Sequence, residues 1–101
     1  MRQGEVYASA PSPLTDEREL YVVLSGDMYN DTTAPTVITA EIELGTRYRD
    51  TALALATDFG LVLLDRLVWV PRTELGERIG MLTSGQVDRA VELVCGLFRN
   101  R

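Results

Sequence analysis

The side chains of this sequence that could do chemistry are arginines, carboxylates and hydroxyls, because the sequence contains no histidine. Without histidine, the commonest general base, the usual zinc ligand and every Ser-His or Cys-His pair are excluded. All ten basic residues are arginine, whose planar guanidinium binds phosphate oxygens in a bidentate manner. A GC-rich coding bias would also produce this arginine usage, so the composition alone does not assign a phosphate ligand.

Arg18 and Glu19 form an adjacent pair directly before an apolar run. A free arginine stays protonated, so Arg18 can stabilise a phosphate but accepts a proton poorly. If Glu19 were partly desolvated, it could act as a general base, with Arg18 as the electrophile. A tight ion pair between the two would instead make them structural, and a solvated strand start is a third alternative.

Arg47, Tyr48 and Arg49 place an aromatic side chain between two cations in a predicted loop. Arginines can contact an RNA backbone, and an aromatic ring can stack on a base. The three residues are therefore candidates for RNA binding, with a solvated loop as the alternative.

Cys95 is the only cysteine, so no disulfide can form within the chain. It lies among Val91, Val94 and Phe98 at helical spacing, which predicts a small buried thiol rather than a nucleophile. The carboxylates form no tight cluster, so no metal site is predicted.

The length and charge of the chain limit its class. With 101 residues, of which 46% are hydrophobic, the chain is sufficient for one domain and its core. The net charge of -5 is unfavourable for sequence-blind nucleic-acid binding, although one local cationic groove remains compatible with it. The sequence has neither an apolar run of membrane-spanning length nor the apolar core of a signal peptide, so we expect a soluble cytoplasmic protein without membrane contact.

Apolar and β-branched runs predict a series of short strands. The expected strands are Gly4–Ser9, Leu20–Ser25, Thr36–Ile42, Thr51–Thr57, Leu61–Leu64, Leu67–Val70 and Arg78–Leu82. Polar loops are expected over Gly26–Asp31 and Gly45–Asp50, and a single helical turn over Arg72–Leu75.

A helix is predicted at the C-terminal end of the sequence. Thr83 followed by Gln86 is a capping box, in which each side chain bonds the backbone of the other residue. After it, apolar residues recur at helical spacing: Val87, Ala90, Val91, Val94, Leu97 and Phe98. The expected fold is mainly β, a compact and partly open barrel packed by one C-terminal helix.

Several of these runs, in their order, resemble the MazF/PemK family of toxin endoribonucleases. They are Arg2–Tyr7, Val22–Ser25, Val37–Ala40, Leu63–Leu67 and Pro71–Thr83. The resemblance implies a single toxin domain over 1–101, with an SH3-like barrel and usually a homodimer. Members of this family are sequence-specific and metal-independent, use no cofactor, and cut single-stranded RNA by attack of a 2'-hydroxyl. A MazE-like antitoxin peptide lies across their active groove.

The resemblance also implies roles for individual residues. The family assigns catalysis largely to an Arg and a Thr or Ser, and Thr39 matches the latter position, although it could be an ordinary β-branched strand residue. The family's Arg-Pro pair falls on Glu19-Leu20, so Arg18 fits only if a one-residue bulge precedes the strand. Ser25 is expected, like the Arg47–Arg49 loop, to bind RNA.

Other functions remain open for the same fold. A catalytically weak or inactive member would act by binding, for example as a CcdB-like gyrase poison. The ending Gly96–Arg101 differs from the aromatic residue followed by small and aliphatic residues that is typical of those poisons. A stand-alone interaction domain is a third possibility.

Overall fold

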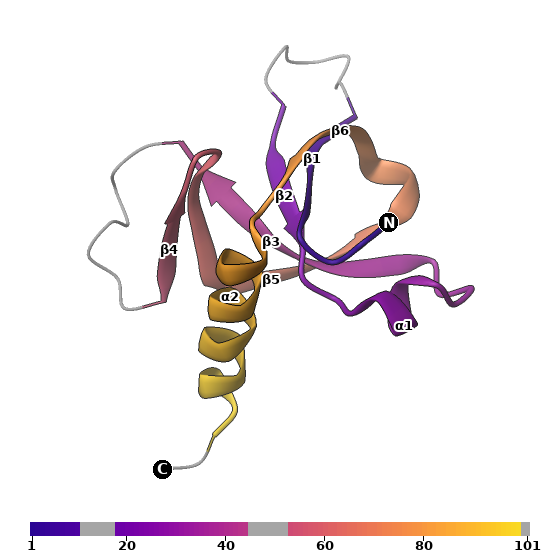
Figure 1. Cartoon of the computed structure of the whole chain (residues 1–101). Coiled ribbons are helices and arrows are strands. Elements are labelled where there is room, and N and C mark those ends of the chain that lie inside the picture. Colours follow the sequence, from indigo (N-terminus) through magenta and orange to yellow (C-terminus); the bar gives the residue numbers. More distant parts are fainter. Residues whose placement is uncertain (11–17, 45–52, 100–101) are drawn as a thin grey trace.

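Six strands, one C-terminal helix and two short helical segments make up the described structure (Figure 1). It is a computed structural model that describes residues 1–10, 18–44 and 53–99. In chain order the elements are β1 (Glu5–Ser9), β2 (Leu20–Val23), α1 (Asp27–Asn30), β3 (Thr36–Glu43), β4 (Ala54–Thr57), β5 (Gly60–Pro71), η1 (Arg72–Glu74), β6 (Leu75–Met81) and α2 (Ser84–Leu97).

The strands form one antiparallel sheet in the order β4-β5-β3-β2-β1-β6. The predicted mainly β fold with a C-terminal helix is confirmed. The sheet curls so that Phe59, in the turn between β4 and β5, contacts Gly80 of the other edge strand, β6. A Cβ atom at Gly80 would lie only 2.3 Å from Cζ of Phe59. The two edges of the sheet therefore meet at a position where only glycine leaves room for the ring.

Replacing Gly80 with valine is expected to destabilise the protein by about 1–3 kcal/mol, because the new side chain displaces the Phe59 ring. Urea unfolding followed by circular dichroism measures the loss. Gly85→Ala is the matched control, since no atom lies within 4 Å of the position of its Cβ. An unchanged midpoint for Gly80→Val would show that the Phe59 contact does not hold the edges together.

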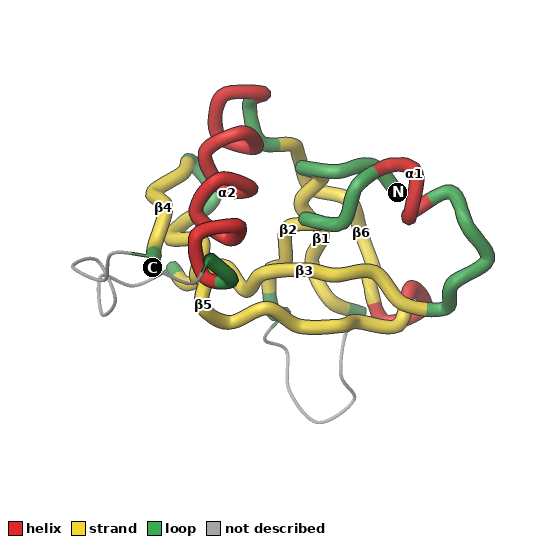
Figure 2. Tube along the Cα trace, turned by 90° about the horizontal axis from the view of Figure 1, so that it is seen from below, coloured by secondary structure: helices red, strands yellow, loops and turns green. Residues whose placement is uncertain are grey.

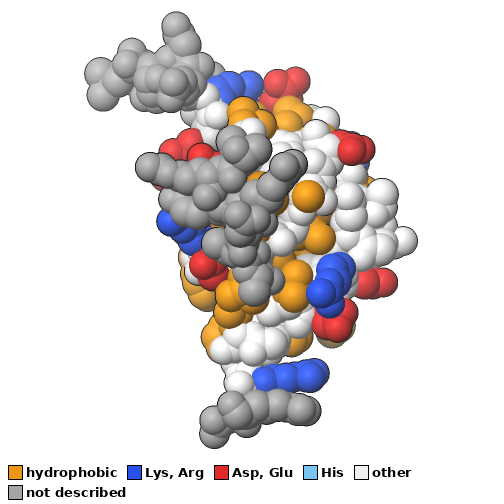
Figure 3. Space-filling view, turned by 90° about the vertical axis from the view of Figure 1, so that its left-hand side faces the viewer, with side chains coloured by type: hydrophobic (Ala, Val, Ile, Leu, Met, Phe, Trp, Pro, Cys, Tyr) orange, Lys and Arg blue, Asp and Glu red, His pale blue; other side chains and the backbone are white. Residues whose placement is uncertain are grey.

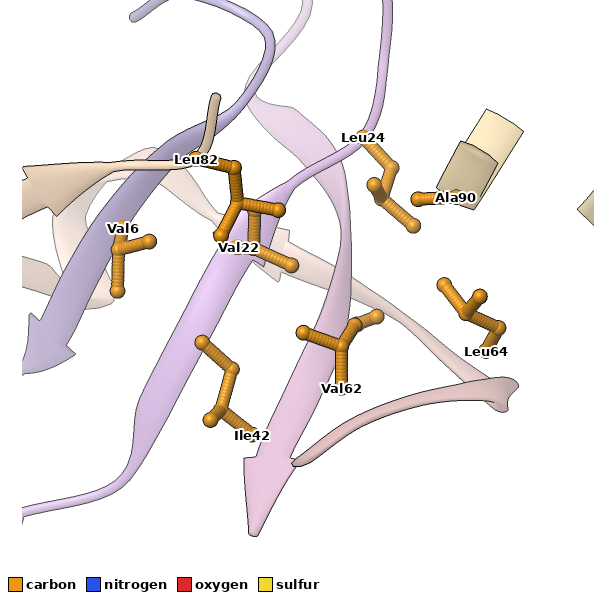
Figure 4. Close-up of a cluster of buried hydrophobic side chains, with 9 residues drawn as sticks. Val6, Val22, Leu24, Ile42, Val62, Leu64, Leu82 and Ala90 are labelled. Carbon is orange, nitrogen blue, oxygen red and sulfur yellow. The ribbon is translucent and has the colours of Figure 1, made fainter. Parts of the chain in front are cut away.

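Two apolar clusters pack on the two faces of the curled sheet. The larger one lies beneath α2 and contains Val6, Val22, Leu24, Ala40, Ile42, Val62, Leu64, Leu82 and Ala90 (Figure 4). The smaller one, on the opposite face, contains Val23, Val37, Val70 and Leu75. Because side chains alternate between faces along a strand, neighbours such as Val22 and Val23 contribute to different clusters.

Helix α2 begins at the predicted capping box, in which Thr83 and Gln86 bond each other's backbone amide. It lies alongside β4 and β5 (Figure 2) and packs against the larger cluster through Val87, Leu93 and Val94, with Ala90 fully buried. The predicted burial of Cys95 is wrong, because Cys95 is exposed. Successive helical residues are about 100° apart, so when Val94 faces the sheet, Cys95 points away from it.

Three local predictions also need correction. The expected loop over Gly26–Asp31 contains the short helix α1. The two strands expected on either side of Asp65-Arg66 form one strand, β5, whose pairing with β3 shifts register between Ala40–Leu67 and Glu41–Leu63. The last strand begins at Leu75 rather than Arg78, directly after the predicted helical turn.

None of the helices in the described part of the chain has the length and apolar character needed to cross a membrane.

Candidate functional site

Arg18 lies against β1 and β6. Its Nε donates to the backbone oxygen of Ser9 at 2.7 Å, and its Nη1 lies 3.4 Å from Oε2 of Glu77. The guanidinium passes over Gly76, where a Cβ atom would be 2.8 Å from Nη2. The side chain is therefore already engaged with protein groups, and any contact with a ligand must share them.

Glu19 has different partners from Arg18. Its backbone amide donates to Oγ of Ser9 at 3.0 Å, and its carboxylate accepts a hydrogen bond from the Tyr21 hydroxyl. The backbone amide of Ser9 donates to the backbone oxygen of Glu19 at 2.7 Å. The backbone hydrogen bonds between β1 and β2 therefore continue to Glu19. Arg18 and Glu19 thus do not form a tight pair with each other, and Glu19 presents an exposed carboxylate.

Thr39 is fully buried at the centre of the sheet, between Val23 on β2 and Val68 on β5. Its hydroxyl donates to the backbone oxygen of Val68 at 3.0 Å. Along the sheet, Thr39 is paired with a residue five positions after Arg18, a separation of about 17 Å at 3.3 Å per residue. The structure does not bring Arg18 and Thr39 together, and the catalytic role of Thr39 stays a prediction.

Ser25 is also buried and fixes the chain after β2. Its hydroxyl lies 2.5 Å from Oδ1 of Asn30, and the amide of Ile38 donates to it at 3.2 Å. These contacts hold α1 against the start of β3 and engage the Ser25 hydroxyl within the protein. RNA binding by Ser25 therefore stays a prediction. Arg47, Tyr48 and Arg49 lie outside the described residues.

A cleft of about 500 Å³ opens between the start of β2 and the end of β3. It is lined by Arg18, Glu19, Leu20, Glu41, Ile42, Glu43 and Leu44. Three carboxylates therefore accompany one guanidinium, and this charge balance alone is unfavourable for a phosphate. On the face of the molecule in Figure 3, the described basic side chains are likewise interspersed with acidic and hydrophobic ones.

A second group of polar side chains crosses four strands, and none of its members was predicted from the sequence as a site residue. The pairing registers place Arg78 beside Tyr7, Tyr7 beside Tyr21, and Tyr21 beside Glu41. The strands that carry them, β6, β1, β2 and β3, are consecutive in the sheet. We call these four residues the cross-strand row; it has a cation at its β6 end and a carboxylate at its β3 end.

Glu5 lies two residues before Tyr7 and forms an ion pair with Arg78, the cation of the row. Its side chain is 10% exposed, and its Oε2 is 2.5 Å from Nε of Arg78. The Arg2 amide donates to the same carboxylate, and the Tyr7 hydroxyl lies 3.4 Å from it. Buried charges need partners of this kind, so the carboxylate and guanidinium are fixed in one arrangement.

Both phenols of the row stay protonated at neutral pH. Burial, reinforced by the neighbouring Glu5, raises the pKa of Tyr7. Burial and the hydrogen bond to Glu19 raise the pKa of Tyr21 well above its usual range, with further contributions from Glu41 and Glu74. Tyr7 and Tyr21 are therefore hydrogen-bond donors rather than bases, and the proton acceptor available beside them is a carboxylate.

An apolar groove of about 220 Å³ lies between α2 and the sheet, away from the cross-strand row. It is lined by Leu24, Ser25, Ile38, Leu67, Trp69, Val94 and Phe98. Trp69 is 59% exposed and Phe98 77% exposed, which is unusual for side chains of this size. In the described residues, no group of acidic or cysteine side chains is arranged to hold a metal ion.

Comparisons with known proteins give the chain a family and a fold. The family described as type II toxin-antitoxin system toxin Rv0299 matches residues 7–97. The structure is similar to a mycobacterial endoribonuclease in complex with its cognate antitoxin, with a TM-score of 0.76 and 18% identity over 99% of both chains. It is also similar to another mycobacterial endoribonuclease structure, with a TM-score of 0.77 and 17% identity over 95% of this chain and 88% of that one. No curated protein matches the sequence.

Proposed function

Because the chain belongs to the Rv0299 family of type II toxin–antitoxin toxins, we propose that it is an endoribonuclease that cuts single-stranded RNA in the cytoplasm. The observation that carries the proposal is the fold shared with mycobacterial endoribonucleases over nearly the whole chain. The cross-strand row and the neighbouring Glu19 supply a carboxylate, protonated phenols and the guanidinium of Arg78, and the guanidinium of Arg18 lies at the cleft beside Glu19. These are the groups that phosphodiester transesterification requires.

The proposed step needs no metal ion and no cofactor. The RNA 2'-hydroxyl transfers its proton to the Glu19 carboxylate, which Tyr21 positions through its hydrogen bond. The 2'-oxygen then forms a bond to the adjacent phosphorus, the bond to the 5'-oxygen breaks, and the 5'-oxygen takes up a proton from water, while Glu19 releases to water the proton that it accepted. Arg18 stabilises the charge that develops on the phosphate oxygens, while Thr39 supports the sheet beneath the site.

The proposed partners follow from the family and from the notable exposure of apolar side chains. A cognate antitoxin would bind and neutralise the toxin, and the mycobacterial endoribonuclease to which this structure is similar is likewise in complex with its cognate antitoxin. A homodimer is proposed because large side chains such as Trp69 and Phe98 are exposed on a small barrel. Recognition of a specific RNA sequence is part of the same proposal.

The test is cleavage of a single-stranded RNA by the purified protein with EDTA present. We expect fragments that end in a 2',3'-cyclic phosphate, because the attacking nucleophile is the 2'-hydroxyl. An oligonucleotide with 2'-deoxyribose at the cleaved position should remain whole and serves as the control. RNA that stays intact after long incubation with excess protein would contradict the proposal.

A second candidate is a toxin-fold module that acts by binding alone. Two observations favour it: Arg18 is engaged with Ser9 and Glu77, and the Thr39 hydroxyl is buried. Intact RNA in the cleavage assay, together with growth arrest in cells that express the protein, would support this alternative.

A further inference from the structure

We propose that Arg78 binds a backbone phosphate of the substrate RNA and that the buried Glu5 carboxylate is a positioning residue that orients its guanidinium. This proposal rests on the proposed function and adds a binding residue to the same site. It concerns the phosphodiester of a single-stranded nucleic acid, and it starts from the strand pairing that joins β6 to β1.

The Glu5–Arg78 pair differs in burial from the surface ion pairs of the chain. The partner carboxylates of Arg2, Arg18 and Arg89 in the described residues are 47%, 69% and 70% exposed, whereas Glu5 is 10% exposed. A buried ion pair contributes little net stability, because desolvation offsets the attraction between the charges. Its effect here is geometric, since Oε2 of Glu5 lies 2.5 Å from Nε of Arg78 and so holds the guanidinium in place.

The fixed guanidinium remains accessible to a ligand. The Arg78 side chain is 52% exposed, although its Nε lies 2.5 Å from the Glu5 carboxylate, whose side chain is 10% exposed. A guanidinium carries five N–H donors, so an ion pair at Nε leaves the two terminal nitrogens for a second acceptor. A phosphate bound there would make charge-assisted hydrogen bonds to a group that has already lost much of its freedom.

The charges along the cross-strand row give the bound RNA a direction. Adjacent strands are about 4.8 Å apart, so Arg78 and Tyr21 are separated by about 10 Å. At the Tyr21 end, the Glu19 carboxylate accepts a hydrogen bond from the Tyr21 hydroxyl, and Glu41 lies beside Tyr21 on β3. A phosphate is therefore favoured at the Arg78 end, while the 2'-hydroxyl that loses a proton lies at the Glu19 end. Arg78 accordingly binds a phosphate next to the one that is cleaved.

This placement predicts a separation between binding and rate. A contact to a phosphate that does not react stabilises the bound substrate and the transition state equally, so its loss raises KM and leaves kcat unchanged. We expect Arg78→Ala to raise KM about tenfold or more, the usual effect of losing a hydrogen bond between charged groups. Because one phosphate contact is lost, the salt dependence of binding to single-stranded RNA should also become shallower by about 0.7 in the log–log slope.

The experiment compares four variants with the wild-type protein. Arg78→Ala removes the cation. Arg78→Lys keeps the charge but loses the planar guanidinium that binds phosphate in a bidentate manner. Glu5→Gln leaves Arg78 without its charged partner. Arg89→Ala is the matched control, because Arg89 forms a surface pair with Glu92 on α2. Cleavage kinetics and the affinity for a 2'-deoxy, uncleavable oligonucleotide are measured over a range of salt, with circular dichroism to verify folding.

The expected result is a raised KM and a shallower salt slope for Arg78→Ala, a raised KM with a preserved salt slope for Arg78→Lys, and wild-type values for Arg89→Ala. Glu5→Gln should raise KM less than Arg78→Ala. If Glu5→Gln does not fold, the two variants of Arg78, whose side chain is half-exposed, still decide whether this residue binds a phosphate. Wild-type KM and salt slope in Arg78→Ala would overturn the inference. The wild-type protein could bind the oligonucleotide in an Arg78-dependent manner but cut no RNA. That result would contradict the proposed function and still support the phosphate contact.

Discussion

Replacing Glu19 with glutamine is expected to lower kcat for RNA cleavage by about 10²–10⁴-fold, with little change in KM. Glutamine preserves the size of the side chain and can still accept the hydrogen bond from Tyr21, but it cannot take the proton of the 2'-hydroxyl. Among the residues assigned to the step, Glu19 combines an exposed carboxylate with a partner that fixes its direction. The measurement is single-turnover cleavage of an RNA oligonucleotide at saturating protein.

Glu92→Gln is the matched control for this prediction. Glu92 is an exposed carboxylate on α2 that pairs with Arg89 at 3.4 Å, so its substitution removes the same charge without touching the proposed base or Arg18. A Glu19→Gln variant that cuts at the wild-type rate, beside an inactive Arg18→Ala variant, would move the chemistry to Arg18. Thr39→Val and Thr39→Ser then show whether the buried hydroxyl takes part, since only serine retains it.

Replacing Leu64 with alanine is expected to reduce the free energy of unfolding by about 2–5 kcal/mol. Leu64 is fully buried in the larger cluster, where β5 meets α2 and the register on β3 shifts (Figure 4). The smaller side chain leaves a cavity that the sheet cannot fill without moving the helix. Chemical denaturation with guanidinium measures the change.

Leu44→Ala is the control for the core prediction. The substitution deletes the same side-chain atoms, but Leu44 is 79% exposed, so these atoms are in contact with solvent rather than with the core. Its free energy of unfolding should remain close to that of the wild type. Equal losses for the two variants would mean that Leu64 does not lie in a packed core.

The sequence predicted the general fold because its signals are local. Alternating strands, the turn before β6 and the Thr83–Gln86 capping box each depend on residues a few positions apart, and the structure contains all three. The toxin class, expected from short motifs in order, is confirmed by the family match over residues 7–97. Cys95 was misplaced because an apolar run on a helix does not reveal which side of it faces the sheet.

The cross-strand row could not be predicted in the same way. Tyr7 and Arg78 become neighbours only through the pairing of β1 with β6, whose register shifts on both sides of the Tyr7–Ala8 segment. Alternation along one strand gives the face of a side chain but not the residue beside it on the next strand. The separation of Arg18 from Thr39 has the same origin, because it depends on the register of β2 on β3.

The pairing of β1 with β6 also bears on the synthesis of the toxin. Among the described strands, β1 is synthesised first, yet one of its two neighbours in the sheet, β6, is synthesised last. Protein domains fold during translation only when the segments that pack together have emerged. Glu5 therefore cannot pair with Arg78 until β6 has been synthesised. In a toxin made in this order, the phosphate contact proposed for Arg78 gains its positioning carboxylate late in synthesis, although that carboxylate is on the first of the described strands.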